Sequence, residues 1–154
     1  MVTLAHILAA ERVRSDVPAA SRKRTLQALG EVFAGADPAL SAQGIFDRLV
    51  ARERLGSTGL GEGCALPHAR VPGLGRALAA FLRLRKGVDF DAPDHEPVDL
   101  VFALLVPEES TEEHLEVLAA IARVFADERV RSSIRAAEEP ARIREVLLSN
   151  GIFD

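Results

Sequence analysis

The apolar residues of this chain recur with helical spacing in some segments and with strand-like spacing in others. Segment 98–106, VDLVFALLV, is almost continuously apolar, which is typical of a strand covered on both faces. Two earlier segments carry apolar residues along one helical face: Leu26, Leu29, Val32 and Phe33 in the first, and Ile45, Phe46, Leu49 and Val50 in the second. This alternation predicts an α/β fold, with a mixed sheet of about five strands flanked by helices on both faces.

Serine residues mark the predicted helix starts. Ser21 and Ser41 stand where a side-chain oxygen can cap a helix, and the helices that follow run to about Phe33 and about Leu55. Further along, the motif STEE from Ser110 has the pattern of a capping box, for a helix ending near Phe125. Two closing helices follow over segments 127–137 and 139–150.

Shorter segments carry strand-like patterns. RVRSDV (12–17) alternates apolar and polar residues and is predicted as an edge strand, and CALPHARV (64–71) as a short strand and its exit. Segment 77–90, ALAAFLRLRKGVDF, predicts a strand, a turn at Lys86-Gly87 and a second short strand.

Composition and charge argue against a nucleic-acid-binding protein and against a membrane-spanning one. At 154 residues the chain is predicted to form one domain over residues 1–154, and its net charge of -4 argues against a nucleic-acid partner. No run approaches the about 18 apolar residues of a membrane span, and the N-terminus lacks the pattern of a signal peptide. We therefore expect a cytoplasmic protein without membrane insertion. Cys64 is the only cysteine, so no internal disulfide can form.

A glycine-rich stretch, GSTGLGEGCALPHAR, runs from Gly56 to Arg70 and contains His68. It lacks the lysine of a P-loop, the spacing of a dinucleotide-binding loop, and the serine of a nucleophile elbow. The four histidines have no zinc-site spacing, so no metal is expected. His68 remains as a candidate nucleophile or acid–base group.

Two further residues fall on helical stripes that also carry apolar residues. Arg52 lies seven residues after Ile45 on one predicted helix, and a buried arginine favours an anion as its partner. His114 continues the apolar stripe of the helix that ends near Phe125. His68 and His114 both follow strand-like segments, and α/β sheets bind ligands beyond the carboxyl ends of their strands. The residues by themselves therefore indicate an α/β domain with a candidate His/Arg anion site.

Three ordered segments resemble one known family: RERLGSTGLGEGCALPHAR (52–70), VDLVFALLVP (98–107) and HLEVLAAIARVFAD (114–127). They are similar to the enzyme IIA family of the bacterial phosphotransferase system, in its fructose/mannitol class and best in the nitrogen-regulatory branch. The similarity runs from about Leu4 to about Leu148. It implies the mannitol-type enzyme IIA fold. Cys64 is a mild departure, since the family more often has an aliphatic residue there.

The resemblance also implies a role for each site residue. His68 matches the histidine whose Nε2 accepts a phosphoryl group from a histidine phosphocarrier protein. Arg52 matches the arginine that contacts the phosphoryl group, and His114 matches a supporting histidine. The loop Gly56, Ser57, Thr58 and Gly59 matches the segment around them, whose backbone N–H groups we expect to face the anion. No cofactor is implied.

Three functions remain open at this point. The favoured one is a phosphohistidine relay that regulates partners such as transporters or sensor kinases. The second is a sugar-specific enzyme IIA that passes phosphate to a fructose- or mannitol-type IIB, and the third is a binding module without phosphorylation. The intact His68, Arg52 and His114 argue against the third. The absence of a linker towards a IIB domain before Asp154 favours the first over the second.

Overall fold

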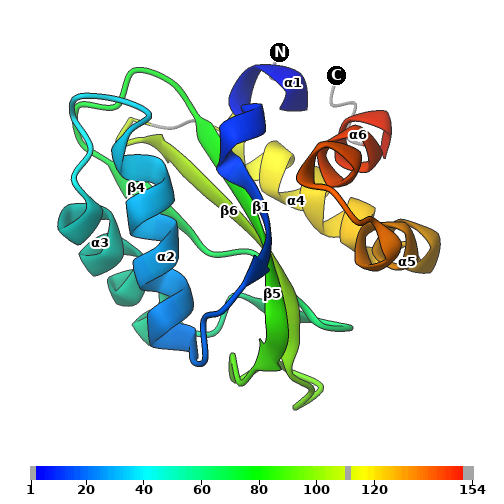
Figure 1. The fold of residues 1–154 in the computed structure, drawn as a ribbon. Helices are drawn as coiled ribbons and strands as arrows, with labels where there is room; N and C mark the ends of the chain where they lie inside the picture. Colours follow the sequence, from blue (N-terminus) through cyan, green and yellow to red (C-terminus); the bar gives the residue numbers. More distant parts are fainter. Residues whose placement is uncertain (1–2, 110–111, 151–154) are drawn as a thin grey trace.

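The computed structural model describes residues 3–109 and 112–150, and it is built around one mixed β-sheet (Figure 1). The sheet has six strands in the order β1-β5-β6-β3-β2, and β4 also pairs with β6. Their bounds are β1 (Val13–Val17), β2 (Gly59–Gly61), β3 (Cys64–Ala65), β4 (His68–Val71), β5 (Leu78–Val88) and β6 (Val98–Pro107). The long pair β5–β6 is antiparallel, whereas β1 pairs with β5 and both β3 and β4 pair with β6 in parallel. The predicted mixed α/β sheet is confirmed, with six strands rather than about five.

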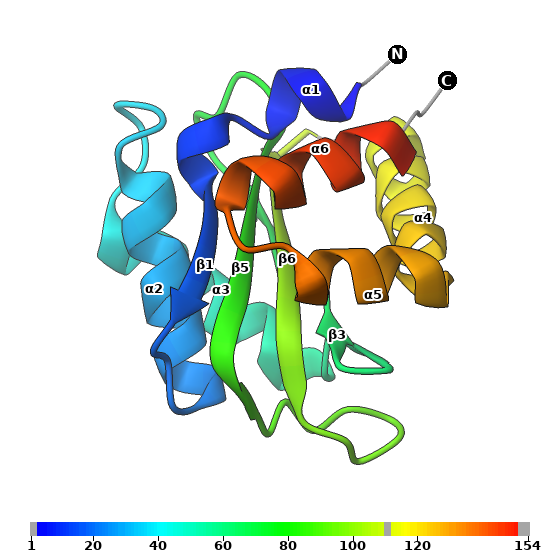
Figure 2. The ribbon, with the colours of Figure 1, turned by 45° about the vertical axis from the view of Figure 1, so that its right-hand side comes forward.

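Helices cover both faces of the sheet, and each face buries its own apolar core. Two helices lie on one face, α2 (Arg22–Ala34) and α3 (Ala42–Leu55). The other face carries α1 (Leu4–Ile7), the short 3-10 turn η1 (Ala10–Arg12), α4 (Glu112–Ala126), α5 (Glu128–Ala136) and α6 (Pro140–Asn150). In Figure 2, α6 and α5 cross in front of the sheet while α4 runs along its side.

The predicted helix caps occur where the sequence places them. The Ser21 hydroxyl accepts a hydrogen bond from the Arg24 N–H, and Ser41 accepts one from Gly44. These bonds satisfy N–H groups that would otherwise lack a partner at the first turn. The capping-box motif begins at Ser110, which lies outside the described residues.

The predicted turn at Lys86-Gly87 is wrong, because β5 continues through both residues to Val88. The pairing of β5 with β6 shifts register between Arg83 and Val88. Lys86 and Gly87 therefore lie in an irregular stretch of a continuous strand and not in a turn. A Cβ on Gly87 would lie 2.9 Å from Cβ of Pro97. The glycine therefore permits close approach of the neighbouring chain rather than a reversal of direction.

The segment 64–71 forms two strands rather than one strand and its exit. Cys64 and Ala65 pair with the start of β6, and residues 68–71 pair with its end, opposite Leu104 to Pro107. His68 therefore opens a strand at the sheet edge, instead of lying free beyond a strand end as the sequence suggested.

The core on the α4 side contains a cluster of three aromatic rings. Phe125 of α4 stacks on Phe81 of β5 with ring centroids 6.2 Å apart. Its ring also meets Phe102 of β6 edge-to-face at 6.1 Å. This cluster joins α4 to the two central strands.

Candidate functional site

Both ring nitrogens of His68 have partners in the structure, and these partners define the tautomer. Nδ1 lies 2.8 Å from the carbonyl oxygen of Leu66, and Nε2 lies 3.3 Å from Nε of Arg52. Arginine can only donate, so Nε2 is the acceptor and carries the lone pair. Nδ1 then carries the proton and donates it to Leu66. The imidazole thus presents an unprotonated Nε2.

Arg52 reaches His68 from the last turn of α3. Its second hydrogen bond runs from a terminal nitrogen to the carbonyl oxygen of Gly56, at 2.8 Å. Gly56 follows the helix with a φ of 153°, in a backbone region that favours glycine. The glycine lets the chain turn at the helix end, so that its carbonyl oxygen accepts from the Arg52 side chain. The structure therefore brings Arg52, Gly56 and His68 together.

The surroundings of His68 keep its imidazole neutral. Burial lowers the pKa of His68 below its ordinary value, and the Arg52 cation lowers the pKa further. The hydrogen bond to Leu66 and the charge of Glu53 act in the opposite direction. A neutral imidazole with a free electron pair on Nε2 is the form that can act as a nucleophile.

Glu53 is a residue of this site that the sequence analysis missed. Its carboxylate is buried and accepts hydrogen bonds from the backbone N–H of Thr58, at 2.9 Å, and from the Thr58 hydroxyl. A signal was present in the sequence, since Ile45, Leu49 and Glu53 are spaced by four and share the buried stripe of α3. A carboxylate on such a stripe requires a donor, and Thr58 supplies two.

The backbone amides of the loop mostly donate within the protein. The N–H of Gly56 bonds to the carbonyl oxygen of Glu53, that of Thr58 to the Glu53 carboxylate, and that of Gly59 to the Ser57 hydroxyl. The Ser57 hydroxyl in turn donates to the carbonyl oxygen of Phe90. We expected these N–H groups to face an anion. In the structure three of them fix the shape of the loop instead.

His114 lies on the same side of the sheet as His68. Ala69 and Val71 belong to the core beneath α2 and α3, so by alternation His68 faces the α4 side, where its register partner Leu104 is packed. His114 stands in the first turn of α4, and its buried Nδ1 has no hydrogen-bond partner among the described residues. Among the residues that the structure describes, no hydrogen bond joins His114 to Arg52 or His68.

Cys64 lies in β3 and is buried within the α4-side core. Burial raises the pKa of its thiol to about 11, so the unreactive thiol form persists at neutral pH. Its role is packing, as expected for the position where the family more often has an aliphatic residue.

In the part of the chain that the structure describes, no group of three or more His, Cys, Asp or Glu side chains is arranged to hold a metal ion. No helix among these residues has the length and apolar character needed to cross a membrane.

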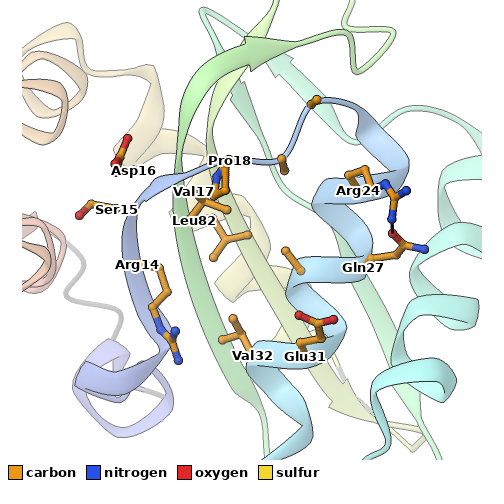
Figure 3. A pocket seen from close by; sticks show the side chains of 13 residues that line it. Arg14, Ser15, Asp16, Val17, Pro18, Arg24, Gln27, Glu31, Val32 and Leu82 are labelled. Carbon is orange, nitrogen blue, oxygen red and sulfur yellow. Dashed lines mark hydrogen bonds between the residues drawn. The ribbon is translucent and has the colours of Figure 1, made fainter.

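A hollow of about 640 Å³ lies between β1 and α2, on the other edge of the sheet from β4 (Figure 3). Three of its charged side chains already have partners. Arg24 donates to Gln27, Arg14 donates to the carbonyl oxygen of Glu11, and Asp16 pairs with Arg85. Two strands separate this hollow from β4, so it is not part of the His68 site.

Comparison with known proteins identifies the family. Residues 6–150 match the family model described as "Phosphoenolpyruvate-dependent sugar phosphotransferase system, EIIA 2". The chain belongs to this EIIA 2 family. A nitrogen regulatory protein of Pseudomonas aeruginosa is 45% identical over 148 residues, which cover 96% of each chain. A fructose-specific EIIA component of Haloferax volcanii is 32% identical over 137 residues, which cover 89% of each.

Solved structures of EIIA proteins share this fold. The nitrogen regulatory protein IIA-Ntr of Neisseria meningitidis superposes with a TM-score of 0.88 at 42% identity, covering 92% of this chain and 97% of that one. The mannitol IIA of Escherichia coli superposes with a TM-score of 0.74 at 21% identity, covering 90% and 97%. The mannitol-type EIIA fold that the sequence predicted is therefore confirmed, and proteins named nitrogen regulatory protein are among the relatives of this chain.

Proposed function

We propose that this EIIA protein is a phosphohistidine relay of the nitrogen-regulatory type, acting as one domain in the cytoplasm. Its phosphoryl donor is a histidine phosphocarrier protein, and its acceptor atom is Nε2 of His68. The observation that carries the proposal is the pair of bonds on the imidazole, with Leu66 on Nδ1 and Arg52 on Nε2. This pair leaves one nitrogen with an available lone pair and places a cation beside it.

The transfer needs no cofactor and no net movement of a proton. The lone pair of Nε2 attacks the phosphorus of the carrier's phosphohistidine, and the donor N–P bond breaks with its electrons returning to the donor nitrogen. Arg52 must release Nε2 for this attack, and its guanidinium can then bond the phosphoryl oxygens. The Nδ1–H bond to Leu66 persists through the step and holds the ring plane.

We propose that the carrier contacts two exposed leucines that neighbour site residues in the sequence. Leu55 is 84% exposed and adjoins Gly56, and Leu115 is 58% exposed and adjoins His114. Large exposed apolar side chains beside a reactive group favour contact with a partner protein.

Alanine variants of Arg52 and His114 are expected to fold and to accept phosphate slowly. We propose that each side chain donates one hydrogen bond to the phosphoryl group, and loss of one such charge-assisted bond costs about 1.5–3 kcal/mol, or roughly tenfold to a hundredfold in rate. Initial rates of label transfer from the phosphorylated carrier measure the effect. Arg54→Ala is the matched control, because Arg54 is exposed on the same helical turn. Normal rates for both Arg52→Ala and His114→Ala would remove these residues from the proposed machinery.

The regulatory output rests on the charge change at His68. A phosphoryl group adds about -1.5 to -2 charges, which would repel an acidic partner surface and desolvate poorly against an apolar one. We propose that transporters or sensor kinases bind this surface according to phosphorylation state. The similarity to nitrogen regulatory proteins supports this output.

The second candidate is a sugar-specific EIIA, which the 32% identity to a fructose-specific component favours. A chase experiment distinguishes the two. The phosphorylated protein is mixed with fructose- and mannitol-type IIB domains from the same organism, and the label is followed. Label that stays on His68 while partner affinities shift supports the regulator. Rapid, complete transfer to either IIB would establish the sugar carrier instead.

A further inference from the structure

Thr58 is linked to Nδ1 of the His68 imidazole by hydrogen bonds through Leu66, and to the partner of Nε2 by the backbone that joins it to Gly56. On one side, the carbonyl oxygen of Thr58 accepts from the N–H of Leu66 at 3.0 Å, and the carbonyl of Leu66 accepts from Nδ1 of His68. On the other side, Thr58 stands two residues after Gly56, whose carbonyl orients the Arg52 side chain against Nε2. Displacement of Thr58 would therefore disturb both contacts of the ring.

Glu53 fixes Thr58 in this position. The hydrogen bonds to its carboxylate, among the described residues, all come from the N–H and hydroxyl of Thr58. Glu53 is 7% exposed and Thr58 is 6% exposed. A buried carboxylate is costly without donors, so separating this pair would leave an unpaired charge. The pair is therefore a rigid point within a glycine-rich segment.

We propose that Glu53 is a positioning residue for phosphoryl transfer at His68, acting through Thr58 on the partners of both ring nitrogens. The proposal rests on the proposed function for its rate measurements, although the ring geometry can be tested without it. Glu53 does not touch the phosphoryl group. Its second effect is electrostatic, because a fixed negative charge near His68 opposes the charge that arrives with the phosphoryl group.

Substitutions separate the bonding role of Glu53 from its charge. Glu53→Ala removes both, whereas Glu53→Gln keeps an acceptor for the Thr58 N–H and removes the charge. Thr58→Val removes only the hydroxyl bond, and Thr58→Ser restores it. Asp47→Ala is the control, because Asp47 is an exposed carboxylate on the same helix.

The first measurement is the nitrogen NMR spectrum of the His68 ring, without any carrier protein. Wild-type protein, Thr58→Ser and Asp47→Ala should hold the tautomer with the proton on Nδ1. Glu53→Ala and Thr58→Val should show a mixture of tautomers, and in Glu53→Gln the pKa of His68 should fall while the tautomer is kept. An unchanged ring spectrum in folded Glu53→Ala overturns the proposal, and so does an unchanged spectrum in Thr58→Val.

The second measurement is the rate of phosphoryl acceptance. Glu53→Ala should be slower by about tenfold to a hundredfold, with partial rescue in Glu53→Gln and a smaller loss in Thr58→Val. Wild-type rates in folded Glu53→Ala would overturn the positioning role. A wild-type protein that accepts no phosphate would instead contradict the proposed function, and the ring spectra would still decide the role of Glu53.

Discussion

His68→Ala is expected to accept no phosphoryl group from a phosphorylated histidine carrier. The substitution removes Nε2, the atom whose lone pair is held ready by the bond from Arg52. Arg52 supplies a charge rather than a nucleophile, and Nδ1 of the second imidazole, His114, is buried, so labelling should be lost. Incubation with phosphoenolpyruvate, enzyme I and the carrier, followed by mapping of the acid-labile label, measures the result.

A second histidine supplies the control for this experiment. His6 is exposed in α1, so His6→Ala should label as the wild type does. Thermal unfolding of both variants checks that the fold is kept. Full labelling of folded His68→Ala would place the acceptor elsewhere and contradict the proposed chemistry.

Phe102→Ala is expected to destabilise the fold by about 3–5 kcal/mol, the usual cost of removing a buried aromatic ring. Phe102 is almost fully buried in the middle strand β6, and its ring meets Phe125 of α4. The cavity would lie between two aromatic neighbours and the sheet, where the backbone cannot readily collapse. Urea denaturation followed by circular dichroism measures the change in the free energy of unfolding.

Phe46→Ala is the matched substitution on the other face of the sheet. Phe46 is only partly buried on α3, so its loss should cost clearly less. Equal losses for the two variants would contradict the view that the aromatic cluster around Phe125 stabilises the α4 face.

Local signals in the sequence were enough to place most helices and strands. Ser21 and Ser41 cap their helices as predicted, because an N-cap depends on only a few neighbouring residues. Lys86-Gly87 has the local pattern of a turn, but the glycine accommodates Pro97, a contact from another part of the chain. The division of segment 64–71 into β3 and β4 likewise depends on pairing with β6.

The sequence likewise predicted some residues of the site and missed others. Helical spacing and the family resemblance selected Arg52 and His68, and the structure joins them by a hydrogen bond. Spacing alone could not show that the loop amides are used internally, because their acceptors are set by the folded path of the chain. Glu53 shares the spacing of Ile45 and Leu49, but its burial depends on Thr58, whose position is set by the folded path of the loop.

The order of strands in the sheet has a consequence for synthesis of the protein on the ribosome. Val13 of β1 pairs with Phe81 of β5, and α2 and α3 share a core with residues of β5 and β6. The ribosome therefore makes β1, α2 and α3 before the strands on which they pack. Contacts so distant in sequence form slowly, and a nascent chain exposes its apolar faces until they do. We expect the first half of the chain to remain unfolded, and dependent on chaperones, until β6 has left the exit tunnel.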